Sequence, residues 1–254
     1  MKKYELTEET KVIGGKTLFR IRALRSFGGI KAGDLGGFIE NERNLSHGGN
    51  AWVGDNAKVG GNAKVSDNVR VGGYAWVEDN ARVDGDAWVG GNAQVVGNAW
   101  VSGDARVNGN AMVFGNARVD GNARVGGDAR VNGDAMVGGN AQVGGNAQVG
   151  GNARVEDNAR VDGDAWVDGN ARVSGDGLIN SNNDYLCEKG LGSHNRSASF
   201  FKCKDGHIHV LCGCFDGNLD EFENKVKEEH GNSKYSKEYL GFIEVVKTHF
   251  EVRQ

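Results

Sequence analysis

The chain lacks several features that define common protein classes. None of its 254 residues is proline, and no apolar run approaches the ~18 residues of a membrane-spanning helix. No apolar segment follows Met1-Lys2-Lys3, so we expect neither a secretory signal nor a membrane partner. The formal net charge of −4 disfavours general nucleic-acid binding, because such binding depends on neutralising phosphates.

Cysteine is scarce, and its distribution indicates a compartment. The four cysteines all lie in the last third of the chain, at Cys187, Cys203, Cys212 and Cys214. This arrangement fits a reduced protein better than a disulfide scaffold. We therefore expect a cytoplasmic location.

Glycine, by contrast, is abundant, with 42 residues, and it recurs with a fixed period. Every sixth residue from Val53 to Val173 is valine, and Ile179 continues the series. Alanine stands two residues before each valine, except that Val69 takes its place once. The unit is Ala-x-Val-x-Gly-Asn/Asp, and such strict repetition indicates a repeat architecture.

Each repeat predicts a short strand followed by a sharp turn. In Ala-x-Val the alternation of a strand turns Ala and Val to one side and x to the other. Gly-Asn and Gly-Asp favour a turn because these residues accept positive φ. Three units close one coil, and each strand then stacks about 4.8 Å from the strand 18 residues later. The sequence therefore predicts an all-β solenoid, a parallel β-helix of about seven coils over residues 50–179.

The repeat resembles that of hexapeptide proteins that form left-handed parallel β-helices, and the handedness is implied by this resemblance. The flanking segments resemble the YdcK-like, or polymer-forming, hexapeptide proteins of prophages. The segments that carry this likeness are Lys3–Leu6, Arg20–Leu24, Gly33–Glu40, Asn44–His47, Cys212–Phe215 and Lys234–Leu240. The resemblance implies a phage or prophage origin, a trimeric assembly in the host cytoplasm, and a partner such as a host-defence protein or a nucleotide signal.

The two ends depart from the repeat. In residues 1–49 we expect a hairpin of Thr10–Ile13 and Thr17–Ala23, then an irregular first coil over Gly33–Leu45, which together cap the open end of the rod. Residues 180–194 are expected to form a linker. Residues 195–254 predict a small α+β (ββαα) module with the elements Ser199–Cys203, His207–Leu211, Leu219–His230 and Ser236–Phe250.

Histidine is absent from the repeats. The six histidines are His47, His194, His207, His209, His230 and His249. Proteins of this fold that act as acyltransferases resemble one another in using a coil histidine as general base, and γ-type carbonic anhydrases bind zinc through coil histidines. Because the coils contain neither histidines nor inserted loops, we expect no enzymatic activity. The alternative is a hexapeptide-type acyltransferase that uses a histidine outside the coils.

A group of zinc-type ligands lies near the carboxyl end. Cys203, His207, His209, Cys212 and Cys214 could in principle supply the four ligands of a zinc tetrahedron. Their spacing matches no familiar zinc finger or ribbon. Alternation along a strand places His207 and His209 on one face, and it likewise places Cys212 and Cys214 on one face. Buried thiols and a histidine pair at a strand edge are the favoured interpretation, so we expect no metal and no cofactor.

The outward x positions form three faces when residues 18 apart are grouped. Face one is Trp52, Arg70, Trp88, Arg106, Arg124, Gln142 and Arg160; face two is Lys58, Trp76, Gln94, Met112, Arg130, Gln148 and Trp166; face three is Lys64, Arg82, Trp100, Arg118, Met136, Arg154 and Arg172. Rungs about 4.8 Å apart place tryptophan beside arginine, within cation–π reach.

These faces have two interpretations. One is a solvated ladder that shields the sheets. The other is an interaction surface, because Trp, Arg and Met are enriched at interfaces and all five tryptophans occupy x positions. We expect a homo-oligomer, with a trimer favoured, and the candidate interaction ladder is Trp52, Arg70, Trp76, Trp88, Trp100, Arg106, Arg118, Arg124 and Trp166.

The amino-terminal segment offers a second candidate site. Residues 1–49 carry 9 Lys and Arg against 6 Asp and Glu, and Arg20 and Arg22 share one side of a strand close to Arg25. Arginine suits carboxylate or phosphate partners, which favours a host protein or a small anionic ligand here; the alternative is pairing with Glu40, Glu42 or coil aspartates. Taken together, the sequence predicts a non-enzymatic scaffold or binding protein.

Overall fold

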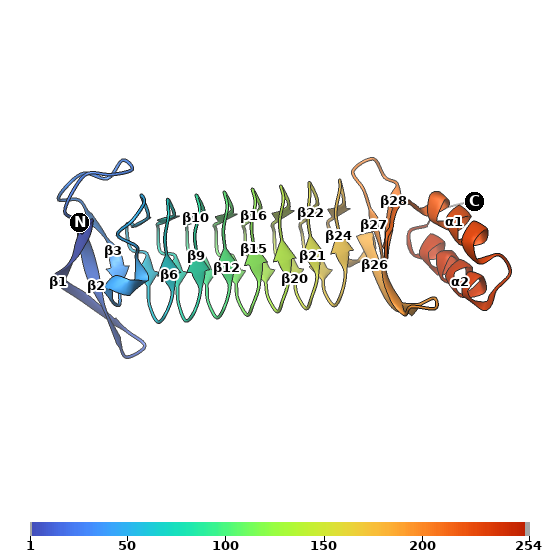
Figure 1. Cartoon of the computed structure of the whole chain (residues 1–254), viewed down its shortest axis with the longest axis horizontal. Helices are drawn as coiled ribbons and strands as arrows, with labels where there is room; N and C mark the ends of the chain where they lie inside the picture. The colour runs from blue at the N-terminus through green and yellow to red at the C-terminus, as the bar shows by residue number, and fades with distance from the viewer. Residues whose placement is uncertain (1, 252–254) are drawn as a thin grey trace.

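The computed structural model describes residues 2–251 as a rod with a different cap at each end (Figure 1). Twenty-two two-residue strands, β4 to β25, build the rod, and the parallel solenoid has about eight turns where seven coils were expected. The strands are β4 (Trp52–Val53), β5 (Lys58–Val59), β6 (Lys64–Val65), β7 (Arg70–Val71), β8 (Trp76–Val77), β9 (Arg82–Val83), β10 (Trp88–Val89), β11 (Gln94–Val95), β12 (Trp100–Val101), β13 (Arg106–Val107), β14 (Met112–Val113), β15 (Arg118–Val119), β16 (Arg124–Val125), β17 (Arg130–Val131), β18 (Met136–Val137), β19 (Gln142–Val143), β20 (Gln148–Val149), β21 (Arg154–Val155), β22 (Arg160–Val161), β23 (Trp166–Val167), β24 (Arg172–Val173) and β25 (Leu178–Ile179).

The strands pair in three parallel sheets, and these sheets are the three predicted faces. Face one runs from β4 to β25, face two from β5 to β23, and face three from β6 to β24, each in steps of three strands. Every pair has the 18-residue register, as in Trp88 opposite Arg106. Between coils the backbone N–H of an x residue donates to the alanine carbonyl 17 residues later, for example Lys58 to Ala75 at 2.9 Å.

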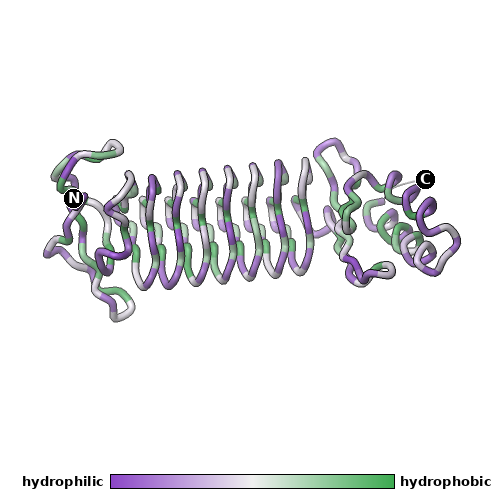
Figure 2. The backbone as a smooth tube through the Cα atoms, viewed as in Figure 1, coloured by the Kyte–Doolittle hydropathy of each residue, from purple (hydrophilic) through white to green (hydrophobic). Residues whose placement is uncertain are grey.

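The repeat explains the interior directly. The repeat valines and alanines are at most 2% exposed, so these two residue types fill the core of the regular coils. Hydrophobic and hydrophilic stretches alternate along each coil (Figure 2). The turn glycines are required for two reasons: Gly109 has φ +67°, and a Cβ there would lie 2.7 Å from the carbonyl oxygen of Gly127 on the next coil.

Asparagine side chains add a second set of bonds along the corners of the coils. In the longest series Asn62 donates to Asn80, Asn80 to Asn98, and Asn98 to Asn116, at 3.0–3.1 Å. Asn116 then donates to Asp134 at 2.9 Å, and a carboxylate cannot donate onward. Such amide ladders are typical of stacked identical strands and stabilise the corners beyond their role as turns.

The amino-terminal cap extends one face of the rod. The hairpin of β1 (Tyr4–Ile13) and β2 (Lys16–Ala23) is confirmed and is longer than predicted, since β1 begins at Tyr4. Strand β3 (Leu35–Ile39) joins β2 to the rod by pairing in parallel with β5, and the short helix η1 (Glu42–Asn44) follows it. Together with a bridge from Leu45 to Val65, this is the irregular first coil.

Side chains replace the missing neighbours of the terminal coils. The carbonyl of Ala51 has no preceding coil, and the buried ammonium group of Lys3 donates to it at 2.8 Å. Asn44 similarly donates to the carbonyls of Gly61 and Ala63. At the other end the backbone N–H groups of Trp166 and Arg172 donate to Asn182 Oδ1 and Ser199 Oγ. These contacts satisfy backbone polar groups that would otherwise be free to pair with the sheet edges of other chains.

The carboxyl-terminal module differs from the prediction. It is a four-stranded antiparallel sheet of β26 (Tyr185–Leu191), β27 (Arg196–Lys202), β28 (Ile208–Cys212) and β29 (Phe215–Asn218), followed by α1 (Leu219–His230) and α2 (Lys234–His249). The linker prediction for residues 180–194 is wrong, because this segment holds helix η2 (Asn182–Asp184) and β26, which pairs with β27. Between residues 2 and 251, no helix is long and apolar enough to cross a bilayer.

Candidate interaction sites on the rod and at its ends

The structure distributes the ladder tryptophans over all three faces. Trp88 lies on face one, Trp100 on face three, and Trp166 at the carboxyl end of face two, with exposed fractions of 41%, 37% and 53%. Trp76 on face two is half-buried. Trp52 is only 7% exposed because it packs edge-on against Phe27 of the cap, at 5.6 Å between ring centroids. The ladder is therefore not one continuous aromatic surface.

The predicted stacking of cations on tryptophan occurs in part. Within residues 2–251, a cation lies near a tryptophan ring in two pairs: Arg118 is 5.6 Å from Trp100, and Lys58 is 5.7 Å from Trp76. Trp100 also donates its indole N–H to Asp84 at 2.9 Å, and burial raises the pKa of this carboxyl group despite that bond. The guanidinium groups of Arg106 and Arg124 are exposed on face one, and Arg118 is exposed on face three.

A groove lies where the cap meets face one. The loop of residues 24–34 lies over the first coils and borders an open groove of about 440 Å³. Trp88 supplies most of its aromatic surface, because Trp52 also lines it but is only 7% exposed, and Asp34 and Asp55 supply carboxylates. Arg70 connects the loop to the face by donating to the Gly28 carbonyl at 2.7 Å. A second cavity of about 330 Å³, which includes Asp86, adjoins the first and shares Arg70 and Trp88 with it.

The three candidate arginines of the cap, Arg20, Arg22 and Arg25, do not form an open cationic site. Arg20 donates to Glu9 at 2.9 Å and to the carbonyl of Gly36 at 3.1 Å. Arg22 forms an ion pair with Glu5, and Arg25 lies over the Phe27 ring at 5.8 Å. The first two arginines thus pair with the neighbouring strand β1 rather than with Glu40, Glu42 or the coil aspartates.

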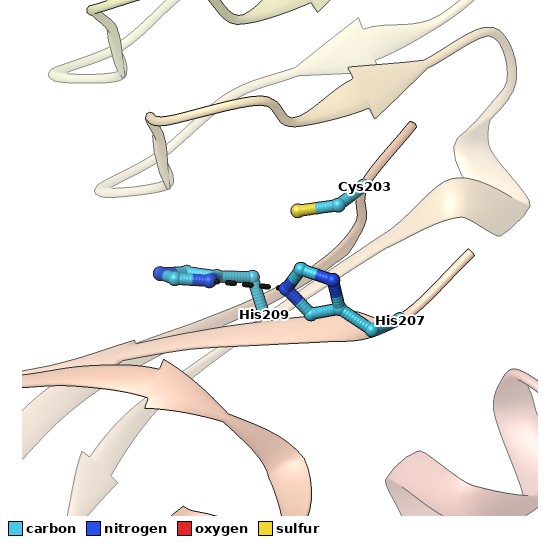
Figure 3. A group of neighbouring side chains, drawn as sticks. All are labelled: Cys203, His207 and His209. Atoms are coloured by element: carbon cyan, nitrogen blue, oxygen red, sulfur yellow. Dashed lines mark hydrogen bonds between the residues drawn. The ribbon is translucent and has the colours of Figure 1, made fainter. Parts of the chain in front are cut away.

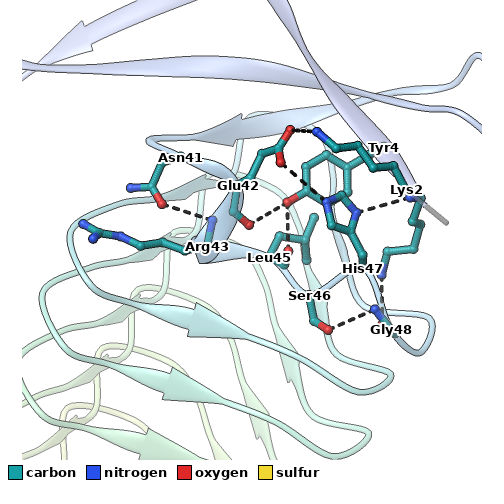
Figure 4. A network of polar contacts seen from close by, with 10 residues as sticks. Lys2, Tyr4, Asn41, Glu42, Arg43, Leu45, Ser46, His47 and Gly48 are labelled. Atoms are coloured by element: carbon teal, nitrogen blue, oxygen red, sulfur yellow. Dashed lines mark hydrogen bonds and ion pairs between the residues drawn. The ribbon is translucent and has the colours of Figure 1, made fainter.

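A buried polar network surrounds His47 in the cap (Figure 4). Its ring stacks on Tyr4 at 4.4 Å, and its Nδ1 accepts the backbone N–H of Lys3 at 3.2 Å. The Tyr4 hydroxyl contacts the carbonyls of Glu42 and Leu45 at 2.9 and 2.8 Å. Burial lowers the pKa of His47 and raises that of Tyr4. These groups hold the cap against the first coil. Their spacing in the sequence does not predict that they lie together.

A cysteine and two histidines lie together at the opposite end of the rod, in the β27–β28 turn and the start of β28 (Figure 3). One ligand atom from each of Cys203, His207 and His209 lies within 4.8 Å of the other two. His207 Nε2 and His209 Nδ1 face each other at 3.4 Å. Their remaining ring nitrogens contact carboxylates, His207 Nδ1 with Asp205 at 2.5 Å and His209 Nε2 with Asp216 at 2.7 Å.

The three side chains of this cluster differ in exposure: Cys203 is buried, His209 is half-buried and His207 is exposed. Cys203 is buried, and its burial, with the charges of Asp205 and Asp176, raises the pKa of the thiol to about 11. The backbone N–H and then the side chain of His207 lower the pKa of Asp205. From the sequence we expected buried thiols and a histidine pair at a strand edge here, although the short spacing Cys-x3-His-x-His is also compatible with metal ligands. Cys212 and Cys214 lie apart from it, beside α1 and Tyr239.

The comparisons with known proteins agree with this architecture. Residues 123–139 and 147–163 match the model of a family described as YdcK β-solenoid repeat. No curated protein matches the chain. The matched segments lie within the regular coils, where the six-residue unit and the parallel pairing are both complete. On these grounds the chain is a YdcK-like β-solenoid protein.

Proposed function

We propose that this protein is a non-enzymatic scaffold that forms a homo-oligomer and binds a segment of a partner protein in the groove between residues 24–34 and face one. The observation that carries the proposal is this groove, because it is a cavity of about 440 Å³ that two tryptophans and two carboxylates line together. Concave sites with a few convergent polar groups are the usual places of recognition.

The chemistry of the groove suits a basic side chain on the partner. Asp34, Asp55 and the neighbouring Asp86 contribute three carboxylates, whereas Arg70 is the cation within both lining sets. Tryptophan faces attract a guanidinium or ammonium group through the ring quadrupole. This favours a lysine or arginine of a partner protein over a small anionic ligand, since Arg20 and Arg22 already have carboxylate partners. The partner in this proposal is a host protein, in line with the phage or prophage origin that the resemblance implies.

The non-enzymatic part of the proposal rests on where the histidines lie. The coils contain none, and His47 is held between Tyr4 and Glu42 instead of facing the groove. A general base needs hydrogen-bond reach to its substrate, and His47 Nδ1 already accepts a backbone N–H while its Nε2 is buried from solvent.

A pull-down with matched tryptophan variants tests the binding site. Trp88→Ser removes an exposed wall of the groove, whereas Trp166→Ser removes an even more exposed tryptophan at the far end of the rod. A partner captured by the parent and by Trp166→Ser but lost with Trp88→Ser supports the groove. Equal loss with both variants, or with Trp166→Ser alone, contradicts it.

Light scattering tests the oligomer separately. The chain has a mass of 27.0 kDa, so a trimer would give about 81 kDa. A monomer at micromolar concentration would refute homo-oligomerisation and leave the groove proposal standing. Trp100→Ala and Trp166→Ala, each on a different face, then report which face is buried between subunits.

A further inference from the structure

The turn that closes the carboxyl end of the rod brings together a donor set that serves no purpose in the proposed binding groove. Cys203 and His207 are the first and last residues of the five-residue turn between β27 and β28, and His209 follows in β28. A short turn holds them: the Cys203 backbone N–H donates to the His207 carbonyl, and Gly206 donates to the Cys203 carbonyl, both at 2.9 Å. Their positions are therefore fixed by backbone bonds.

Each imidazole contacts a carboxylate through one ring nitrogen and turns its other nitrogen towards the other imidazole. If the N–H of each neutral ring donates to its carboxylate, Asp205 or Asp216, then His207 Nε2 and His209 Nδ1 both present lone pairs. These two nitrogens lie 3.4 Å apart. Two lone pairs at this distance repel unless a cation, either a proton or a metal ion, lies between them.

We propose that Cys203, His207 and His209 form a zinc site with an open fourth position. Zinc at its usual distance of about 2.0–2.1 Å from nitrogen places two tetrahedral nitrogen ligands about 3.3 Å apart, which the observed 3.4 Å separation nearly equals. The thiol lies over the same gap (Figure 3). It supplies the third, sulfur ligand, for which zinc has high affinity.

The thiol needs only a small adjustment. The ligand atoms of the cluster lie within 4.8 Å of one another, and a tetrahedral site with usual Zn–S and Zn–N lengths requires sulfur and nitrogen about 3.6 Å apart. Closing this gap takes at most about 1.2 Å, within the range of a cysteine χ1 change. Zinc replaces the thiol proton, which leaves as a hydrated proton, so the bound ligand is the thiolate.

The carboxylates strengthen the assignment. Metal-bound histidines usually donate their second ring N–H to a carboxylate, which fixes the tautomer and the ring orientation. Asp205 and Asp216 occupy this place for His207 and His209 respectively. Because the side chain of His207 is 41% exposed, solvent reaches the cluster and water would complete the tetrahedron.

The location indicates what the metal would do for the chain. Cys203 forms a bridge to Gly177 in the last coil, and Lys204 donates to the Asp176 carbonyl at 3.2 Å. A zinc ion would therefore brace the turn through which the module contacts the last coil. The full chain should then melt at a higher temperature with zinc than after chelation, because zinc binds the folded site.

Titration calorimetry of the chelator-treated full chain with zinc chloride tests the proposal. We expect one equivalent to bind, more than tenfold weaker binding for His207→Ala, and about 10–100-fold weaker binding for the positioning variant Asp216→Asn. His194→Ala and Cys214→Ser, exposed residues outside the cluster, serve as matched controls and should bind as the parent does.

Cobalt substitution tests directly whether the sulfur of Cys203 binds the metal. The cobalt-loaded parent should show a thiolate-to-cobalt charge-transfer absorption that disappears in Cys203→Ser and persists in Cys214→Ser. Because Cys203 is buried and its replacement could unfold the turn, the surface variant His207→Ala keeps the test independent of that outcome. Failure of the parent to bind zinc would overturn the proposal and leave a shared proton as the explanation of the 3.4 Å contact. Unchanged binding in His207→Ala would also overturn it, because zinc would then bind elsewhere.

Discussion

Truncation of a single interior valine tests the physical basis of the rod. Val113 lies in the middle of face two, is fully buried, and stacks between Val95 and Val131. Val113→Ala removes two methyl groups, which at about 0.8 kcal/mol per buried carbon costs about 1.6 kcal/mol in transfer free energy. The cavity left behind adds about 1 kcal/mol, because backbone bonds to both neighbouring coils prevent collapse. The expected loss is about 2–3 kcal/mol.

Urea unfolding measured by circular dichroism gives this loss as a lower midpoint with an unchanged slope. Met112→Ala is the matched control, because Met112 precedes Val113 on the same strand and points outwards. Val113→Asp is the harsher form and should prevent folding or cost several kcal/mol, since it buries an unpaired charge. A loss below about 0.5 kcal/mol for Val113→Ala, which is typical of surface positions, would refute the account of the interior.

Two further predictions concern polar groups. Asn98→Asp should lower the free energy of unfolding in urea by about 1 kcal/mol, because the carboxylate still accepts from Asn80 but can no longer donate to the Asn116 oxygen and is repelled by it. Asp134→Asn is the control: residue 134 only accepts at the end of this ladder, so the free energy of unfolding should hardly change. Burial, and to a smaller extent the charge of Arg25, lower the pKa of Lys3 from 10.5 to about 8. Below pH 8 the charged lysine therefore lowers the free energy of unfolding, and this loss is recovered as the pH rises from 8 towards 10.5. The stability of the parent relative to Lys3→Met should therefore increase between pH 7.5 and 9.5, and a flat or falling difference would contradict the assignment.

The regular parts of the fold were predictable because one local pattern decides them. The Ala-x-Val unit fixes which side chain is buried, and its 18-residue recurrence fixes which residues are neighbours, so the three faces follow from the sequence. Helix α1 also matches its predicted bounds, because Asn218 is a strong capping residue and Gly231 ends the helix.

The parts that were missed depend on contacts between distant residues. The segment Tyr185–Leu191 has no clear alternation and becomes a strand through pairing with β27. Trp52 was expected on an outward face, yet the loop of residues 24–34 covers it, and the sequence does not fix the path of that loop. The Cys203 cluster was visible as a spacing, but the direction of each ring depends on Asp205 and Asp216, which come from a turn and from a different strand.

The three-sided coil also ties the orientation of the two ends to the number of repeats. Removing one six-residue unit would shorten the rod by about 1.6 Å and rotate the carboxyl-terminal module by about 120° about the long axis. Removing three units would shorten it by about 4.8 Å and restore the original orientation. Relatives that differ by multiples of 18 residues would thus keep the groove and the terminal module in phase, while other changes in repeat number would turn one against the other.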